Sequence, residues 1–394
     1  SWLLMQGFFT LDQFGDDVLA ASARPGGGPS MGGGGGGGGG VSPGSTTFDG
    51  MCSVDEIRGF GHHLLDSGGW GGFTNADFVP AEEGGRTTKL GKGISGSVSR
   101  MKQLSTGHIF AIKTITLNSS DNKLEAAREM LTTKFPNGEG REYLATYYGM
   151  FVSPFHTAVN IVMELMAGSM SDIAPVPEDI AARIAAMVLR GLAFMHKDAK
   201  LMHRDIKPSN ILYGFDGTFK ITDFGLTSTL VNQEGETRSS TTFVGTTLYM
   251  APERLKNHGQ CAASDVFAFG LSIAEIVLGA HPLKHVLGAK FDGSGDDRFW
   301  GMMDATGELN HDAARLPNIF ATMPGGLSPT FVDFLCRATS LSTAERWPAH
   351  RLLEHPWITS QALGGAGSSI EARSTDRDIV RDFLIARNRL APRS

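Results

Sequence analysis

The sequence predicts an α+β protein with two lobes, a small β-rich lobe at residues 88–164 and a larger helical lobe at residues 169–358. Two observations indicate this order. From Leu90 onward, apolar residues alternate with polar ones on both sides of a glycine-rich turn, as in strands. Beyond Ser171 they recur at helical spacing, in a stripe made of Ile180, Ile184, Met187, Val188 and Leu192. A chain of 394 residues can bury one large core or two moderate ones.

The segment before these strands differs in composition. Residues 21–50 are low in complexity and contain nine consecutive glycines, so they offer little apolar surface to offset the entropy lost on ordering. We therefore expect residues 1–50 to be disordered, serving as a flexible tether or having no role. Within them, residues 8–20 could form a short amphipathic helix. Residues 51–87 carry apolar side chains among many glycines, and we expect them to pack partly on the small lobe.

The small lobe is predicted from its strand-like segments and one helix. Strands flank the glycine-rich turn, and another strand ends at Lys113. A helix is expected over residues 122–134, because four apolar residues there share one face. Strand-like segments follow at 146–152 and 159–165. The turn itself reads Gly91-Lys92-Gly93-Ile94-Ser95-Gly96-Ser97-Val98.

Composition excludes several classes of protein. The balance of 35 basic and 41 acidic residues predicts no nucleic-acid partner. No apolar run approaches the ~18 residues needed to span a bilayer, and the first residues lack the basic start of a signal peptide. We therefore expect a cytoplasmic or nuclear protein. Free thiols in a reducing compartment are expected for the three cysteines, which are Cys52, Cys261 and Cys336.

Two motifs carry the chemistry. Residues 203–210 read His-Arg-Asp-Ile-Lys-Pro-Ser-Asn, and Asp223-Phe224-Gly225 begins thirteen positions after Asn210. This order supplies an acid, a cation and two metal-binding side chains, which phosphoryl transfer needs for positioning and charge neutralisation. Asp205 is predicted to accept the proton of a substrate hydroxyl, while Asn210 and Asp223 are predicted to hold Mg²⁺. From these motifs the chain resembles the eukaryotic protein kinases over residues 88–358.

The glycine-rich turn is predicted to cover the phosphates of ATP. A lone G-x-G-x-x-G also occurs in dinucleotide-binding folds, where it runs into a helix. Here a strand follows, which favours the kinase loop. The resemblance implies that Lys113 pairs with the ATP phosphates and with a glutamate on the next helix. Glu125 and Glu129 are both candidates, and the match of Arg128-Glu129-Met130 to the family favours Glu129.

The resemblance also implies an adenine site. Met163 corresponds to the gatekeeper, and the segment from Glu164 to Met166 would offer backbone groups to the base. The apolar residues expected to sandwich adenine are Leu90, Val98, Ala111 and Leu212.

Further roles follow from the family pattern around the catalytic loop. Lys207 would reach the γ-phosphate, as in serine/threonine-type kinases, and Thr246 would touch Asp205 and Lys207. Glu253 should pair with Arg346. Asp265 should brace the backbone of the catalytic loop, and His203 is expected to be a core histidine that supports it.

The segment between Asp223 and Glu253 is predicted to be an activation loop. Its clustered hydroxyls suggest phosphorylation, and Arg204 could bind the added phosphate. The alternative is that serine and threonine simply suit a mobile loop. The hydroxyl-bearing residues beside Arg238 are Thr237, Ser239, Ser240, Thr241 and Thr242.

Within the kinases, the segments 208–212, 243–246 and 249–255 resemble the mitogen-activated protein kinase kinases. That resemblance implies a MAP kinase as protein substrate and an upstream activating kinase. The family's two phosphosites, four positions apart, would fall on Arg238 and Thr242. The earlier site therefore carries no hydroxyl, unless the longer loop shifts it to Thr237 or Ser239. Another kinase of the same group and a partner-binding pseudokinase remain alternatives. In the tail, residues 359–394, a helix over 376–390 could recruit an upstream kinase or pack on the large lobe.

Overall fold

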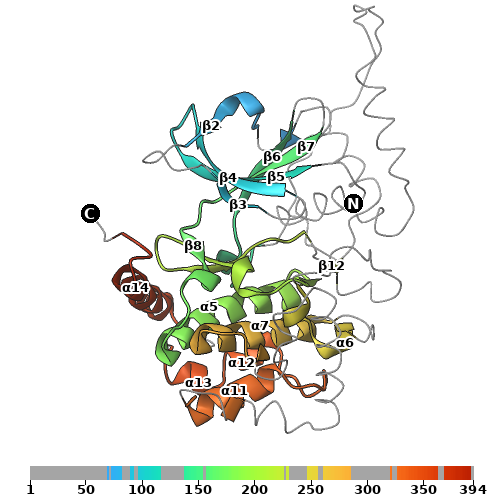
Figure 1. Ribbon diagram of the computed structural model, residues 1–394, viewed down its shortest axis with the longest axis vertical. Coiled ribbons are helices and arrows are strands. Elements are labelled where there is room, and N and C mark those ends of the chain that lie inside the picture. The colour runs from blue at the N-terminus through green and yellow to red at the C-terminus, as the bar shows by residue number, and fades with distance from the viewer. Residues whose placement is uncertain are drawn as a thin grey trace, which may run out of the picture.

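The computed structural model describes the small lobe, most of the large lobe and the C-terminal tail. The described residues are 69–70, 72–81, 89–92, 96–116, 137–153, 157–225, 228–229, 246–255, 261–284, 320–321, 326–362 and 368–391. Several predictions lie outside them, namely those for residues 1–50, the tip of the glycine-rich turn at 93–95, the helix over 122–134 with Glu125 and Glu129, the hydroxyl cluster at 237–242, and Cys52. The described part forms a β-sheet lobe above a helical lobe, which confirms the predicted α+β architecture (Figure 1).

The small lobe is one antiparallel sheet. Its strands run in the order β1-β6-β7-β5-β4-β2, and β3 pairs with the first half of β4. The strands are β1 (Gly69–Trp70), β2 (Phe78–Pro80), β3 (Lys89–Lys92), β4 (Gly96–Gln103), β5 (Ile109–Thr116), β6 (Tyr147–Val152) and β7 (Ala158–Met163). The segments predicted at 146–152 and 159–165 are therefore strands, as expected.

The segment before the glycine-rich turn contributes to this sheet. β1 pairs with β6 at one edge, and β2 pairs with the second half of β4 at the other. Phe78 of β2 is buried and stacks on Phe151, with ring centroids 5.6 Å apart. Phe73 and Phe110 complete this aromatic cluster. Phe78 and Ala81 thus belong to the small-lobe core, and the burial of a large aromatic ring such as Phe78 contributes most to its stability.

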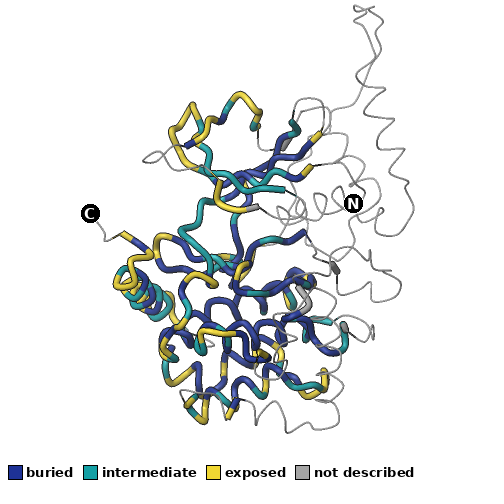
Figure 2. The backbone as a smooth tube through the Cα atoms, in the orientation of Figure 1, coloured by how far each residue is buried: buried dark blue, intermediate teal, exposed yellow. Residues whose placement is uncertain are grey.

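The large lobe is built around α5 (Glu178–Lys197) and α7 (Ala262–Leu278). All five residues of the predicted stripe in α5 are buried. Acidic residues occupy its first turn and His196 with Lys197 its last, which suits the helix dipole. Buried backbone concentrates around these two helices in Figure 2. The outer helices are α6 (Pro252–Leu255), α11 (Pro329–Ala338), α12 (Ala349–Leu352), α13 (Pro356–Thr359) and α14 (Ile370–Ala386).

Short strands line the top of the large lobe. The hairpin of β10 (Ile211–Tyr213) and β11 (Phe219–Ile221) also pairs with β8 (Gly168–Ser169). β9 (Leu201–Met202) pairs with β12 (Ser228–Thr229). The catalytic motif predicted at 203–210 therefore lies between two strands, β9 and β10, and the Asp223 motif follows β11.

The tail forms a helix, α14, that begins earlier than the predicted 376–390. Its N-cap Ser369 accepts a hydrogen bond from Ala372 N. The helix packs on the flank of the large lobe (Figure 1), where Val380 and Leu384 are fully buried. Packing on the large lobe is therefore the alternative that the structure shows. None of the described helices is long and apolar enough to cross a membrane.

Candidate active site

The predicted catalytic loop meets the Asp223 motif at the junction of the lobes. Two residues here adopt left-handed backbone conformations, Arg204 with φ 73° and Asp223 with φ 66°. Residues other than glycine rarely adopt this backbone region, because their Cβ atom makes it strained. Such strain persists only where the surrounding structure enforces it. The backbone is therefore held in place on both sides of the site.

Asp205 gathers the other catalytic-loop side chains. Its Oδ2 accepts hydrogen bonds from Lys207 Nζ at 2.7 Å and from Asn210 Nδ2 at 2.9 Å. Asn210 Nδ2 also donates to the backbone oxygen of Asp205 at 2.8 Å. The other carboxylate oxygen, Oδ1, is buried and has no hydrogen-bond partner in the described part of the chain. A buried acceptor without a partner is costly, so this oxygen is suited to receive a hydroxyl.

Asp265 on α7 holds the loop from below, as predicted. Its two carboxylate oxygens accept the backbone N–H groups of His203 and Arg204, each at 2.8 Å, and His196 Nε2 lies 2.9 Å from Oδ2. Burial alone would raise the pKa of Asp265. The contacts with His196, His203 and the Arg204 backbone outweigh burial and lower that pKa. A stable carboxylate thus fixes the strained backbone beside Asp205.

His203 is the supporting core histidine that the sequence predicts. Its side chain is fully buried, and its Nε2 lies 2.8 Å from the backbone oxygen of Thr222. Its ring meets that of Phe224 edge to face. His203 therefore joins the catalytic loop to the residues on both sides of Asp223.

Lys113 connects the two lobes. Its Nζ lies 2.9 Å from Oδ1 of Asp223, an ion pair between β5 of the small lobe and the segment after β11. Side-chain exposure is 12% for Lys113 and 43% for Asp223, so the Asp223 carboxylate remains accessible. The predicted partner of Lys113, Glu129, lies outside the described residues, and that pairing stays a prediction.

Asn210 and Asp223 fit a divalent cation by the chemistry of their atoms. The described residues hold no group of three or more His, Cys, Asp or Glu side chains that could bind a metal without further ligands. The side-chain amide of Asn210 uses its nitrogen, Nδ2, to donate two hydrogen bonds to Asp205. The amide oxygen of Asn210, Oδ1, is therefore left as an acceptor for a cation. The backbone oxygen of Asn210 accepts from Thr222 N at 3.0 Å, so Asn210 lies close to Asp223. Carboxylate and amide oxygens, with phosphate and water, are the ligands that Mg²⁺ takes.

The glycine-rich segment is a strand–turn–strand, as the kinase loop requires. Gly91 pairs with Val98, and Lys92 with Ser97, between β3 and β4. The tip at 93–95 lies outside the described residues. Gly96 has a packing role that sequence reasoning missed, because a Cβ there would lie 1.8 Å from the Thr114 oxygen of β5. That glycine is required for sheet pairing, whatever it offers to a phosphate.

The residues predicted around adenine lie on neighbouring strands. Ala111 and Met163 are paired in register between β5 and β7, and both are buried. Leu212 lies on β10 of the large lobe, while Leu90 on β3 is 52% exposed. The sandwich itself stays a prediction, but its three members from the small lobe, Leu90, Val98 and Ala111, lie on the neighbouring strands β3, β4 and β5.

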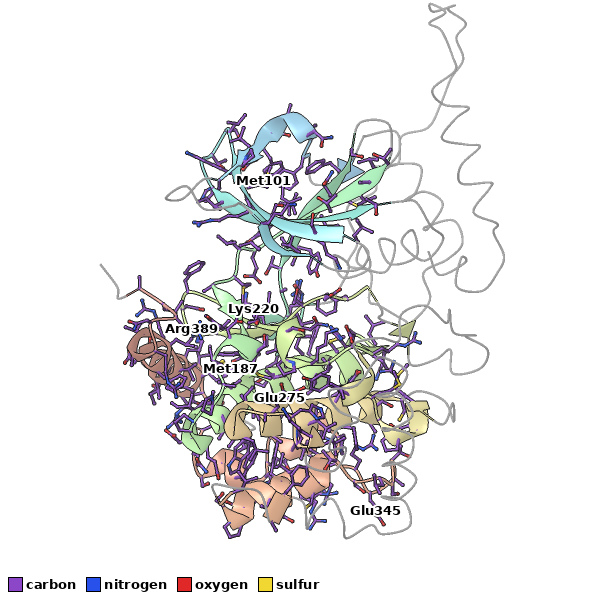
Figure 3. The ribbon with its side chains drawn as sticks, in the orientation of Figure 1. Met101, Met187, Lys220, Glu275, Glu345 and Arg389 are labelled. Atoms are coloured by element: carbon purple, nitrogen blue, oxygen red, sulfur yellow. The ribbon has the colours of Figure 1, made fainter. Side chains whose placement is uncertain are left out.

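Glu164, at the link between the lobes, has partners that the sequence did not reveal. Its side chain accepts from Thr146 N at 2.6 Å and from Lys220 Nζ at 2.8 Å (Figure 3 labels Lys220). Its own N–H donates to the Thr146 oxygen at 3.0 Å. This segment can therefore offer adenine the backbone carbonyl of Glu164 and the backbone N–H and carbonyl of Met166. No motif pairs residues 56 positions apart, so only the structure shows this contact.

The last part of the predicted activation loop contains a helical turn over Thr246–Tyr249. The Thr246 side chain lies outside the described part, so its contact with Asp205 stays a prediction. The predicted pair of Glu253 and Arg346 is confirmed, with Arg346 Nη1 at 2.8 Å from Oε1 and Nη2 at 3.1 Å from Oε2. Burial would raise the pKa of Glu253, but Arg346 and a hydrogen bond from Ser264 outweigh it and lower the pKa.

Comparison with known proteins decides the family. Residues 85–358 match the protein kinase domain. The chain belongs to the protein kinase family. Within it, the chain is similar to MAP kinase kinases. Mitogen-activated protein kinase kinase 5 of Leishmania mexicana is 34% identical over 302 residues, which cover 76% of this chain and 53% of that protein.

Two further relatives carry the same kind of name. MAP kinase kinase MKK1/SSP32 of Saccharomyces cerevisiae is 34% identical over 69% of this chain and 52% of its own length. Mitogen-activated protein kinase kinase 1 of Arabidopsis thaliana is 32% identical over 68% of this chain and 72% of its own length. The kinase thus spans about half the length of the first two relatives and most of the third. A protein kinase domain implies ATP binding and the use of a divalent metal ion.

Proposed function

We propose that this kinase transfers the γ-phosphate of Mg-ATP to protein hydroxyls, and that its substrate is a MAP kinase. The observation that carries the transfer is the state of Asp205. One of its oxygens is held by Lys207 and Asn210, and the other is buried with no hydrogen-bond partner in the described residues. That oxygen supplies a fixed acceptor for the hydroxyl that attacks the phosphate.

The chain's own residues divide the remaining work. Lys113, held by Asp223, offers a cation to the α- and β-phosphates from the small lobe. Lys207 lies beside Asp205 and neutralises charge that develops on the transferred phosphoryl group. Asp265 keeps both backbone N–H groups of the loop in place and so orients Asp205. Positioning of this kind supplies most of the rate enhancement in phosphoryl transfer.

Asn210 and Asp223 would hold Mg²⁺. When bound, the metal ion neutralises the β- and γ-phosphate oxygens and orients them for in-line transfer. Lys113 holds the Asp223 carboxylate from the opposite lobe through an ion pair of 2.9 Å.

The MAP kinase substrate rests on the similarity to MAP kinase kinases and on the segments at 208–212, 243–246 and 249–255. By the same resemblance an upstream kinase would activate the enzyme by phosphorylating the predicted activation loop, and Arg204 would bind the added phosphate. The hydroxyls between residues 237 and 242 remain the candidates, namely Thr237, Ser239, Ser240, Thr241 and Thr242. The family pattern alone does not choose among them, because Arg238 occupies the position four before Thr242.

A transfer assay tests the proposal. The full chain, treated with an activating kinase, is incubated with Mg-ATP and a catalytically inactive MAP kinase, and the phosphates are located by mass spectrometry. We expect labelling of Thr and Tyr in the activation loop of that MAP kinase. Asp205→Asn should lower the rate by about 10²–10⁴-fold, because the proton acceptor is lost. Its matched control is Asp198→Asn, an exposed carboxylate at the end of α5, which should leave the rate unchanged.

The alternatives have distinct outcomes. Preferential labelling of a MAP kinase kinase would assign this chain to a neighbouring tier of the cascade. No transfer to any protein by the activated chain, with nucleotide binding intact, would identify a pseudokinase. Nucleotide binding by Asp205→Asn must remain at the level of the unmodified chain, since Asp205 makes no predicted contact with ATP.

A further inference from the structure

The β10–β11 hairpin connects the tail helix to the predicted metal site. Its first strand begins directly after Asn210, and its second ends two residues before Asp223. The two strands share only three residue pairs, Ile211 with Ile221, Leu212 with Lys220 and Tyr213 with Phe219. At about 3.3 Å per residue, the turn lies roughly 10 Å from both metal ligands. A displacement of the turn is therefore transmitted over a short distance.

The tail helix α14 contacts the backbone of this turn. Arg381 Nε donates to the Phe215 oxygen at 3.0 Å. Gly217, with φ +87°, lies so close to the helix that a Cβ on it would be 2.4 Å from the Arg377 oxygen and 2.9 Å from Arg381 Cβ. The Phe215 side chain is 57% exposed, so hydrophobic burial of that ring is not what holds the turn. The turn and the helix fit against each other at the closest approach that glycine allows.

α14 is itself anchored to the core of the large lobe. Val380 and Leu384 are fully buried, and Asp376 Oδ1 lies 2.9 Å from Arg183 Nη1 of α5, with only 3% of the Asp376 side chain exposed. At the far end, Arg387 Nη2 donates to the Pro175 oxygen at 3.0 Å. The contacts with the turn therefore tie the hairpin to α5, one of the two helices around which the large lobe is built.

We propose that α14 is a positioning element for the metal site, in that its docking against Phe215 and Gly217 sets the spacing of Asn210 and Asp223. This inference rests on the proposed function, since it takes these two residues as the Mg²⁺ ligands. Arg381 is a positioning residue, because it touches the turn and not the nucleotide. Linkage is reciprocal: if docking favours metal-nucleotide binding, metal and nucleotide must favour docking to the same degree.

The first test measures how much Mg²⁺ the full-length protein needs to bind ADP, by calorimetry at increasing Mg²⁺. Arg381→Ala removes the hydrogen bond to Phe215, and we expect about three- to tenfold more Mg²⁺ at half-saturation, as for one lost hydrogen bond. Arg381→Lys, which keeps a donor, should recover most of the effect. Asp382→Ala, an exposed neighbour on the same helix, is the control and should match the unmodified chain. The rate of transfer at saturating Mg²⁺ should change less than the Mg²⁺ requirement.

The second test introduces a side chain on the turn. Gly217→Ala and Gly107→Ala share the strain of a positive φ, +87° and +76°, but the nearest atom to a Cβ on Gly107 is Lys102 Cε at 3.8 Å. Only Gly217→Ala should raise the Mg²⁺ requirement and speed amide hydrogen exchange over residues 370–386. In the unmodified chain, saturating Mg-ADP should slow exchange in the same residues.

The outcomes separate this inference from the proposed function. If the unmodified chain binds no Mg-nucleotide, the proposed function fails, and this inference fails with it. If the unmodified chain binds Mg-nucleotide but Arg381→Ala and Gly217→Ala speed exchange in α14 with an unaltered Mg²⁺ requirement, only the inference is overturned. Unchanged exchange in both variants would overturn it as well, because the described contacts would then hold nothing.

Discussion

At the scale of single residues, the site depends on ionisable groups. Burial and hydrogen bonds control whether these groups are charged. Asp265 stays a carboxylate because three donors surround it, although burial opposes that charge. His281 shows the opposite case. It is 5% exposed beside Tyr249, and burial lowers its pKa to about 4 against the opposing hydrogen bond with the Leu248 backbone. His281 thus remains neutral at pH 7 beside the turn over Thr246–Tyr249.

His281 makes stability depend on pH. Its folded pKa lies below its unfolded value of about 6.5, so between pH 6.5 and 4 the unfolded chain binds more protons. The stabilising contribution is complete above pH 6.5 and is lost as the pH falls to about 4, by up to about 3 kcal/mol. Urea unfolding across this range should show the slope, and His281→Asn should flatten it. The exposed His350, changed to Asn, serves as the control, and an equal flattening by both variants would contradict this account.

At the scale of elements, a buried ion pair joins α6 to the segment before α12. Arg346 is 3% exposed, forms two hydrogen bonds with Glu253 and lies with its guanidinium 5.0 Å from the Phe267 ring. Phe267 of α7 is thus a packing partner of this pair. The pair fixes α6 on the large lobe, and with it the turn that begins at Thr246.

Breaking that pair should be costly. Arg346→Ala leaves the Glu253 carboxylate partly buried without its cation, and we expect a loss of about 3–5 kcal/mol in the free energy of unfolding. The exposed pair of Arg337 and Asp333, 3.4 Å apart and about half exposed, provides the comparison. Arg337→Ala should cost no more than about 1 kcal/mol. Denaturant titrations of both variants measure the difference, and equal losses would refute the assigned weight of burial.

At the scale of the whole molecule, the small lobe is larger than its motifs suggest. The predicted kinase region starts at residue 88 and the matched domain at residue 85, yet β1 and β2 precede both. The two strands pair with the sheet at its two edges. Phe78 of β2 and Phe73, which lies between β1 and β2, join the aromatic cluster of the lobe. The lobe that carries Lys113 therefore depends on residues that contain no kinase motif.

Two truncated chains test this boundary. A chain that starts at Gly85 lacks both edge strands, whereas one that starts at Gly69 keeps them. The loss of Phe73 and Phe78 should lower the melting temperature of the shorter chain by at least about 5 °C relative to the longer one. Differential scanning calorimetry gives the comparison directly. Melting temperatures within a degree of each other would show that the edge strands contribute little.

Predictions from sequence succeeded where one segment carries all the information. The catalytic loop, the stripe of α5 and the strand order around the glycine-rich turn are local patterns, and the structure contains the elements that they indicate. Asp265 and the pair of Glu253 with Arg346 were predicted because the family pattern records contacts that spacing alone does not. The predicted start of α14 is too late, since Ser369, its cap, lies beyond the apolar part of the helix.

The sequence by itself determined that this chain is a two-lobed kinase and predicted which residues form its chemical core, because motif order and periodicity are properties of the chain alone. Only the tertiary structure decided how those parts are held. In it, Lys220 pairs with Glu164 and Lys113 pairs with Asp223. The turn at Gly217 packs closely against α14. Periodicity reports which face of an element is buried, but not which distant element covers it. The partners 110 residues apart at the active site become neighbours only when both lobes have folded.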